Sequence, residues 1–298
     1  MAIAAEGEVL AQTQYGSAGR FATARKAVRR NPAGTVAGVF CFFLVILAIV
    51  GPNVSPYDAN KIGFPYLQAP SIDHPMGTDN LTRDLSSRIV YGARNSLGIA
   101  FTAIFLSTFA GIALGLTSGY LGGPLDLAVS RIIDIALAYP ALVLVIFLVT
   151  VFGRDFLTIA LAIGIILTPG VTRVVRGATI GIRHQQFIEA ALSVGNQPFR
   201  IMYRHILPNI MAPIIVIASL NIGIAILIEA ALSFLGLGVS SALNPSWGRM
   251  LNETRSSWQL GWWTMIFPGL AISSAVLAFN IFGDALRDWL DPRLRGSR

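Results

Sequence analysis

The chain has 298 residues, of which 54% are hydrophobic and only 12% charged, and its formal net charge is +7. Soluble proteins carry roughly 25% charged residues, so this composition excludes a surface that lies mostly in water. The single cysteine, Cys41, excludes an intrachain disulfide, and the three histidines have no spacing typical of metal ligands. We therefore expect no metal site and no cofactor bound by this chain. The basic residues fall between apolar segments rather than in one patch, which argues against a nucleic-acid partner.

Long intervals without charge predict an all-α, polytopic membrane protein with about six transmembrane helices. A spanning helix needs roughly 17–25 mainly apolar residues, and the first interval is longer than the apolar part of a signal peptide, so we interpret it as a retained span. The apolar cores of the six predicted spans are Gly34–Val50, Leu97–Leu116, the stretch from Asp134 to Gly153, Phe156–Thr172, the stretch from Pro208 past Ile228, and Trp262–Gly283.

The distribution of lysine and arginine predicts the orientation. With the N-terminus inside, 15 of the 22 basic residues face the cytoplasm and 7 face outward, as the positive-inside rule requires. Both termini are therefore predicted to be cytoplasmic. The predicted parts are a cytoplasmic tail 1–32, a first helix 33–51, an extracytoplasmic loop 52–95, a five-helix core 96–284 with a cytoplasmic loop 173–208 and an outer loop 236–261, and a cytoplasmic tail 285–298.

The two outer loops carry signals of the membrane interface. Leu81, Leu85 and Ile89 share one helical face, which predicts a short interfacial helix over Leu81–Arg94. Four of the five tryptophans lie in or next to the outer loop 236–261. We expect these four to anchor the protein at the interface. They are Trp247, Trp258, Trp262 and Trp263.

Catalytic signatures are missing from the sequence. A phosphate-binding loop needs Gly-Lys, whereas the only lysines, Lys26 and Lys61, follow Arg25 and Asn60. No histidine lies well inside a predicted span, so a Ser–His arrangement in the membrane is also disfavoured. We therefore predict no catalytic residue, and the chain is not an ATPase by this route.

Small and charged residues within the spans are candidates for packing or transport. Gly111, Gly115 and Gly119 let another helix approach closely, and we favour packing within the chain over a dimer contact. Asp134 lies one turn from Arg131, which favours a local ion pair. Glu229 has no obvious local partner. Asp134 and Glu229 therefore remain candidates either for the translocation path or for buried polar packing.

The inner loop predicts a helix, a glycine hinge and a second helix. Gly195 is suited to end a short helix that contains Glu189. Asn196 is expected to cap the next helix, with Pro198 in its first turn and Pro208 at its end. Such an element between two spans is suited to transmit force, and its two alanines would leave a shallow surface for a partner.

This loop resembles the EAA signature of permease subunits from bacterial ATP-binding-cassette (ABC) importers. Residues before and after it also resemble the C-type permease of dipeptide and oligopeptide importers, with His205 and Thr82 as departures from the usual isoleucine and glycine. The residues that match the EAA signature are Glu189, Ala190, Ala191, Gly195, Leu207 and Pro208. The further matching stretches are His74–Asp79, Tyr91–Arg94, Gly119–Gly123, Pro245–Gly248, Phe267–Gly269 and Asp291–Arg293.

The resemblance implies a type I importer fold in the bacterial plasma membrane, surrounded by lipid. The chain would form half of a translocation pathway with a second homologous permease. Two cytoplasmic ATPase subunits, which bind ATP and Mg²⁺, would contact the six residues of the EAA signature. An extracytoplasmic binding protein would deliver dipeptides or oligopeptides, or, within the same family, nickel or haem. A secondary transporter or channel is the alternative of another class, for which broken helices or internal repeats would be expected.

The predicted orientation can be tested with single cysteines in a Cys41→Ser background. Cysteines at Asn60 and Ser256 should react with an impermeant thiol reagent added outside intact cells, whereas a cysteine at Gln185 should react only after permeabilisation. Labelling of Gln185→Cys from outside would contradict the orientation.

Overall fold

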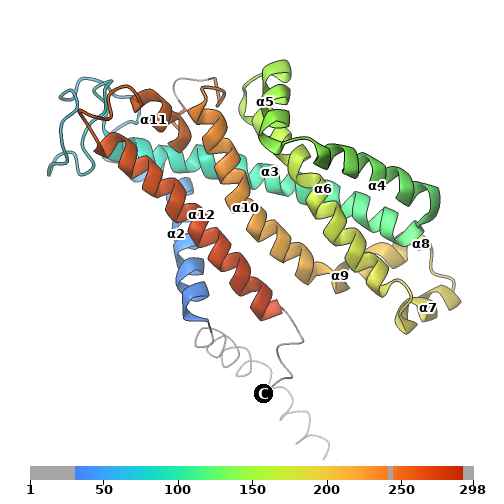
Figure 1. Cartoon of the computed structure of the whole chain (residues 1–298). Helices are drawn as coiled ribbons and strands as arrows, with labels where there is room; N and C mark the ends of the chain where they lie inside the picture. The colour runs from blue at the N-terminus through green and yellow to red at the C-terminus, as the bar shows by residue number, and fades with distance from the viewer. Residues whose placement is uncertain (1–30, 241–243, 291–298) are drawn as a thin grey trace, which may run out of the picture.

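The computed structural model describes residues 31–240 and 244–290, and these ranges contain helices and loops but no strand. Five helices are long and apolar enough to cross a membrane, or six if one bent pair counts as a span. The helices (Figure 1) are α2 (Pro32–Val54), α3 (Leu85–Leu121), α4 (Gly123–Ala138), α5 (Ala141–Phe152), α6 (Phe156–Ile182), α7 (Gln186–Ser193), α8 (Pro198–Ile201), the π-helical turn η1 (Met202–Ile206), α9 (Leu207–Asn209), α10 (Met211–Phe234), α11 (Trp247–Thr254) and α12 (Trp263–Leu290).

The third predicted span is not one straight helix. It contains the end of α4 and the whole of α5, and these two helices meet at an angle of 93°. Tyr139 between them has an extended backbone, and Pro140 follows it as the residue before α5. The proline ring disfavours helical backbone at the preceding residue, so the break falls at this position. The charge-free run therefore covers α5 but misses most of α4, and the prediction of a single helix here is wrong.

Three helices are longer than predicted. The segment Leu85–Arg94 is helical, but it is the first part of α3 and not a separate interfacial helix, so that prediction is wrong. Asp84 begins α3 by accepting a hydrogen bond from the Ser87 amide (2.8 Å). Likewise α6 continues ten residues past Thr172, and α12 runs through Leu290 into the predicted tail 285–298. Residues 1–30 and 291–298 of the two predicted tails lie outside the described residues.

The core forms where α3 packs along α6, with α10 against both. Small residues allow this approach: a Cβ atom on Gly115 would lie 2.7 Å from the Thr172 carbonyl oxygen and 2.7 Å from Val175 Cβ. Gly111 and Gly119 face Val171 and Thr179 in the same way. The three glycines therefore pack within the chain, as predicted.

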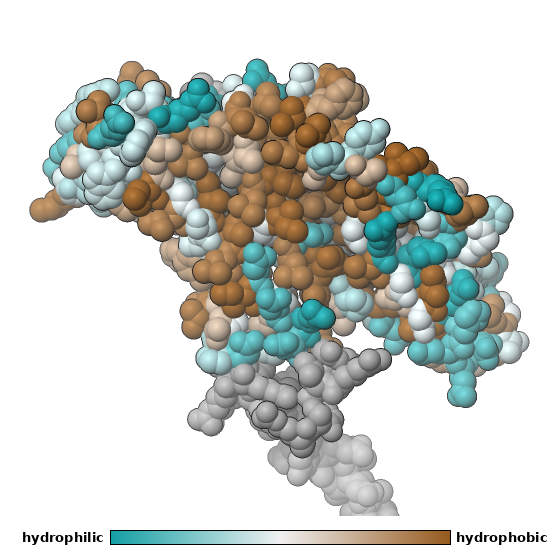
Figure 2. Space-filling view, in the orientation of Figure 1, coloured by the Kyte–Doolittle hydropathy of each residue, from teal (hydrophilic) through white to brown (hydrophobic). Residues whose placement is uncertain are grey.

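Polar residues gather at the two ends of the molecule, and a wide apolar surface lies between them (Figure 2). One end carries α7. The other end is a compact layer that we call the cap, residues 55–84 together with α11 (Figure 1). Trp247 and Trp263 are buried here, and their indole N–H groups donate to the carbonyls of Ile89 (3.0 Å) and Thr78 (3.1 Å). These two tryptophans are thus structural and not interfacial anchors, whereas Trp258 and Trp262 are exposed.

Close contact between α3 and α6 makes Gly115 sensitive to a single methyl group. Gly115→Ala should lower the melting temperature of the purified protein, because the new Cβ overlaps the α6 backbone. Gly177→Ala is the matched control on α6, since a Cβ there meets nothing within 4 Å and alanine favours helix. Equal melting temperatures for the two variants would contradict this account of the core.

Candidate functional site: the α7–α9 segment and the polar layers around it

The segment α7–α9 (residues 186–209) projects from the end of α6 and returns to the start of α10 (Figure 1). Its turn has the geometry expected from the sequence. Gly195 has a φ of +81°, its amide donates to the Leu192 carbonyl (2.9 Å), and the Asn196 amide donates to the Ala191 carbonyl (3.2 Å). This pair of bonds is the Schellman arrangement, which favours glycine at the left-handed position. The glycine hinge is therefore present.

The role predicted for Asn196 is wrong. Its side-chain amide donates back to the Ala191 carbonyl (3.1 Å) and so closes α7. The residue before α8 is Gln197, and its side chain makes no capping bond. Pro198 occupies the first turn of α8, as predicted.

One face of the segment packs against α3 and α6. Ala191 is buried in this cluster, so only Ala190 of the two alanines is exposed, which corrects the shallow surface expected from both. The buried cluster consists of Leu116, Val171, Val175, Ile188, Ala191, Ile201, Met202, Ile206, Ile210 and Ile214. Burial of this face holds the segment on the two helices that form the core.

The opposite face of the segment is apolar and exposed. Phe199 and Tyr203 lie side by side with ring centroids 4.5 Å apart, and Phe199 is 66% exposed. Glu189 is exposed on α7. The large apolar side chains exposed on the segment are Phe187, Leu192, Val194, Phe199 and Tyr203. Exposed large apolar side chains that gather on one short segment make it a candidate interaction site.

The return of the segment into α10 is nearly continuous helix. The Leu207 amide donates to the Met202 carbonyl, five residues back, which makes the π-helical turn. The prediction that Pro208 ends the helix is wrong, because α9 runs to Asn209 and the break falls at Ile210. Only one non-helical residue therefore separates the segment from α10.

Arginines on α6 tie its end to neighbouring helices. Asp134 accepts from Arg173 (2.6 Å), so the local pair expected with Arg131 is replaced by a pair between α4 and α6. Arg176 binds Asp126 on α4 (2.7 Å). The Asp134 pair is half-exposed on the surface.

Glu229 lies inside the fold and not on an open surface. Its side chain accepts a hydrogen bond from Ser233 (2.7 Å), and the residue is only 2% exposed. The hydroxyls of Ser96 on α3 and Ser246, the residue before α11, lie next to its carboxyl group. Glu229 therefore joins α10 to α3 and to the cap, and Asp134 lies about a hundred residues away on a different helix.

The cap contains a partly buried ionic cluster that was not predicted, although two of its pairs, Asp79 with Arg83 and Arg249 with Glu253, are each four residues apart. Glu253 on α11 accepts from Arg83 (2.6 Å), Arg88 (2.8 Å) and Arg249 (2.9 Å). Asp79 accepts a further bond from Arg83 (2.7 Å). Because Glu253 lies at least 165 residues from Arg83 and Arg88, local pattern could not pair them. The cluster fastens α11 to the start of α3.

Two carboxyl groups of the cap have lowered pKa values. Burial would raise the pKa of Glu253, but the charges of Arg88 and Arg83 outweigh burial and hold it below its usual value. Burial would also raise the pKa of Asp84. Hydrogen bonds from Ser86, Ser87 and His74 (2.9 Å) outweigh it and lower this pKa. Both groups therefore favour the folded state when ionised.

Comparison with known proteins gives two family matches. Residues 111–296 match the family described as "Binding-protein-dependent transport system inner membrane component". Residues 19–70 match the "N-terminal TM domain of oligopeptide transport permease C".

Relatives cover almost the whole chain. The dipeptide transport system permease protein DppC of Alkalihalophilus pseudofirmus is 41% identical over 285 residues, which cover 95% of this chain and 93% of that protein. The glutathione transport system permease protein GsiD of Pectobacterium atrosepticum is 40% identical and covers 89% of each chain. The solved structure of the MetNI methionine ABC transporter in an inward-facing conformation has a chain with a TM-score of 0.56 and 18% identity, covering 68% of this chain and 96% of that one. This structural likeness shows the fold.

The ionic cluster predicts a pH-dependent stability of the cap. Glu253→Gln should destabilise the protein by on the order of 3 kcal/mol at neutral pH, because it removes the carboxylate that buried Arg88 contacts at 2.8 Å and leaves only the more distant Asp79. A lowered carboxyl pKa contributes stability above the unfolded value, about 4, and loses it as pH falls through the folded value. The difference in melting temperature between wild type and Glu253→Gln should therefore shrink below about pH 4. Asp73→Asn, an exposed change in the cap, should show no such difference; a pH-independent difference for Glu253→Gln would contradict the assignment.

Proposed function

The chain belongs to the family of binding-protein-dependent transport system inner membrane components, and on this premise we propose that it is one permease subunit of an ATP-driven importer of short peptides. The proposed substrates are dipeptides and similar small peptides, because the relatives that cover almost the whole chain transport a dipeptide and glutathione by name. A second homologous permease would complete the pathway. An extracytoplasmic binding protein would deliver the peptide.

The observation that carries the proposal is the two-sided character of the α7–α9 segment. Its inner face is buried on α3 and α6, and its outer face exposes apolar side chains around Phe199. A docked ATPase would cover this outer face. Since only Ile210 separates the segment from α10, displacement of the docked segment would be passed directly to a spanning helix.

ATP and Mg²⁺ belong to the partner subunits in this proposal. The sequence has no Gly-Lys pair from which this chain could build a phosphate-binding loop. Two ATPases would bind the cytoplasmic side, where the α7–α9 segment and both termini are proposed to lie. ATP binding would bring the two segments together and turn the pathway outward, and hydrolysis would return it.

The proposed function is tested by reconstituting the complete complex with its own binding protein in proteoliposomes. Uptake of a labelled dipeptide or of glutathione should require ATP on the side of the membrane where the ATPases are bound. Disabling the phosphate loop of the ATPases should abolish uptake. Uptake that persists on an ion gradient alone would identify a secondary transporter.

Substitutions at Gly195 can distinguish a defect in coupling to the ATPases from a defect in folding. Gly195→Val should strongly reduce uptake, because a β-branched residue at a φ of +81° costs about 1–2 kcal/mol. A Cβ at this position meets nothing within 4 Å, so the cost lies in the backbone and not in a clash. Gly195→Asn is the matched control and should retain most activity, since asparagine tolerates the left-handed region.

Phe199→Asp should release the ATPases without lowering the melting temperature of the permease. Glu189→Ala should have a smaller effect on ATPase binding, because one exposed charge contributes little.

Co-purification of the ATPases and peptide-stimulated hydrolysis are the measurements. Normal docking, hydrolysis and uptake in both Gly195→Val and Phe199→Asp would show that the segment is an ordinary connection between spans.

A further inference from the structure

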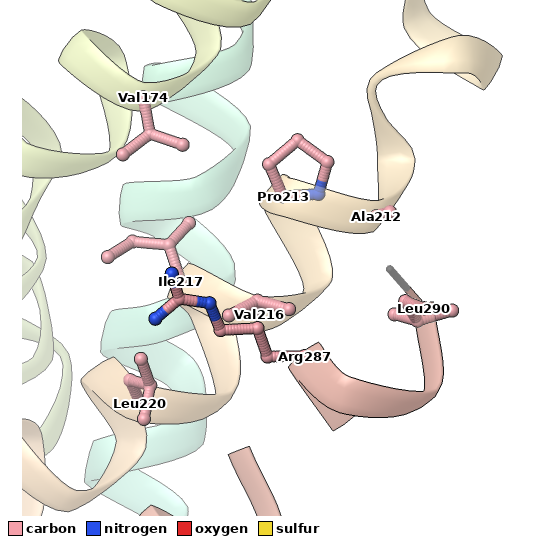
Figure 3. Close-up of a pocket in the computed structure, with 8 residues that line it drawn as sticks. All are labelled: Val174, Ala212, Pro213, Val216, Ile217, Leu220, Arg287 and Leu290. Carbon is pink, nitrogen blue, oxygen red and sulfur yellow. The ribbon is translucent and has the colours of Figure 1, made fainter. Parts of the chain in front are cut away.

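An apolar groove lies where the start of α10 meets α6 and the end of α12 (Figure 3). Its volume is about 410 Å³, within the range of roughly 300–1,000 Å³ that is typical of small-molecule sites. Seven of the eight lining residues are apolar and the eighth is a cation. They are Val174, Ala212, Pro213, Val216, Ile217, Leu220, Arg287 and Leu290.

Arg287 extends over the groove instead of pairing with an acid. Figure 3 shows its side chain running along α10, with the guanidinium group beside Ile217. No ion pair or hydrogen bond of this guanidinium is made to any residue in 31–240 or 244–290. Asp288, the next residue on α12, instead accepts from Asn31 (3.5 Å). The helix dipole favours a basic residue in the last turn, but it does not explain why this one lies across an apolar groove.

We propose that this groove binds one anionic phospholipid, with the phosphate on Arg287 and an acyl chain along Val216, Ile217 and Leu220. A cation at the end of a spanning helix, next to an apolar channel, complements a molecule that joins a negative headgroup to a hydrocarbon chain. A peptide fits this groove poorly, because its amide groups would find no hydrogen-bond partner among seven apolar side chains. A second protein subunit would have to supply a carboxylate to Arg287.

The groove lies close in the chain to the α7–α9 segment. Ala212 and Pro213 line it, and they follow Ile210 by two and three residues. The wall of the groove is therefore the part of α10 that lies nearest to the α7–α9 segment.

Lipid retention by the purified complete complex tests the proposal without any measurement of transport, so its failure would leave the proposed function untouched. The complex is equilibrated in nanodiscs of phosphatidylcholine with a minor share of phosphatidylglycerol, and the phosphatidylglycerol that remains bound is counted by native mass spectrometry. Arg287→Gln should lower the retained phosphatidylglycerol about five-fold, the attraction of one arginine near the membrane surface for an anionic headgroup. Ile217→Trp, which fills the groove and keeps the charge, should lower it as well.

Arg131→Gln is the matched control, because Arg131 is exposed on α4 and does not line the groove. Retention should be unchanged in this variant. Equal losses in Arg131→Gln and Arg287→Gln would show general attraction to the membrane and overturn the proposal, as would unchanged retention in Arg287→Gln. Displacement of the lipid by a dipeptide would assign the groove to the peptide path instead. Crosslinking of Val216→Cys to the second permease, with no lipid retained, would assign it to a subunit interface.

Discussion

The close contact of α3 with α6 through glycine is the constraint on which the rest of the molecule depends. In a bilayer, the attraction between helices comes mainly from packing, since lipid is as apolar as leucine. Gly111, Gly115 and Gly119 remove the side chains that would hold the two backbones apart. The contact includes the backbone of Arg176, and α6 continues past it to the α7–α9 segment. A shift of α6 against α3 would therefore displace the segment and the cluster that anchors it.

The two ends of the molecule are built with different interactions. The cap is held by ion pairs in which Glu253 serves three arginines, and by two buried indole groups. Removal of one partner from such a cluster leaves a buried charge, so its geometry is strongly specified. The α7–α9 segment is held by aliphatic side chains such as Ile188 and Ile206, which tolerate small sliding movements better than directed bonds do. One end is thus suited to stay fixed and the other to move.

Local sequence patterns predicted most of the helices and the turn at Gly195. They could not predict contacts between residues that lie far apart in the sequence. The apolar cores of the spans, the hinge at Gly195 and the packing of the three glycines follow from period, backbone preference and size. The bend after Tyr139 has a local cause in Pro140, but an apolar run shows only that a segment avoids water and not whether it is straight. Asp134 finds Arg173, 39 residues away, in preference to its neighbour Arg131, because tertiary packing brings α6 beside α4.

The long-range ion pairs of the cap were not predicted from the sequence, whereas the glycine hinge was. The conformation of a turn depends on a few adjacent residues, so the turn at Gly195 can be predicted from the sequence. Arg83 and Arg88 reach Glu253 only after α3 and α10 are placed, since α11 packs against both helices. Gly248 shows how tight this seat is: a Cβ there would overlap the backbone of Ala230 on α10. Glu229 precedes Ala230 and lies against Ser96 and Ser246, so the upper part of α10 is fixed by the cap. Because the lower part joins the α7–α9 segment through Ile210 alone, a force on that segment would be passed to α10, whose upper part is held by the cap.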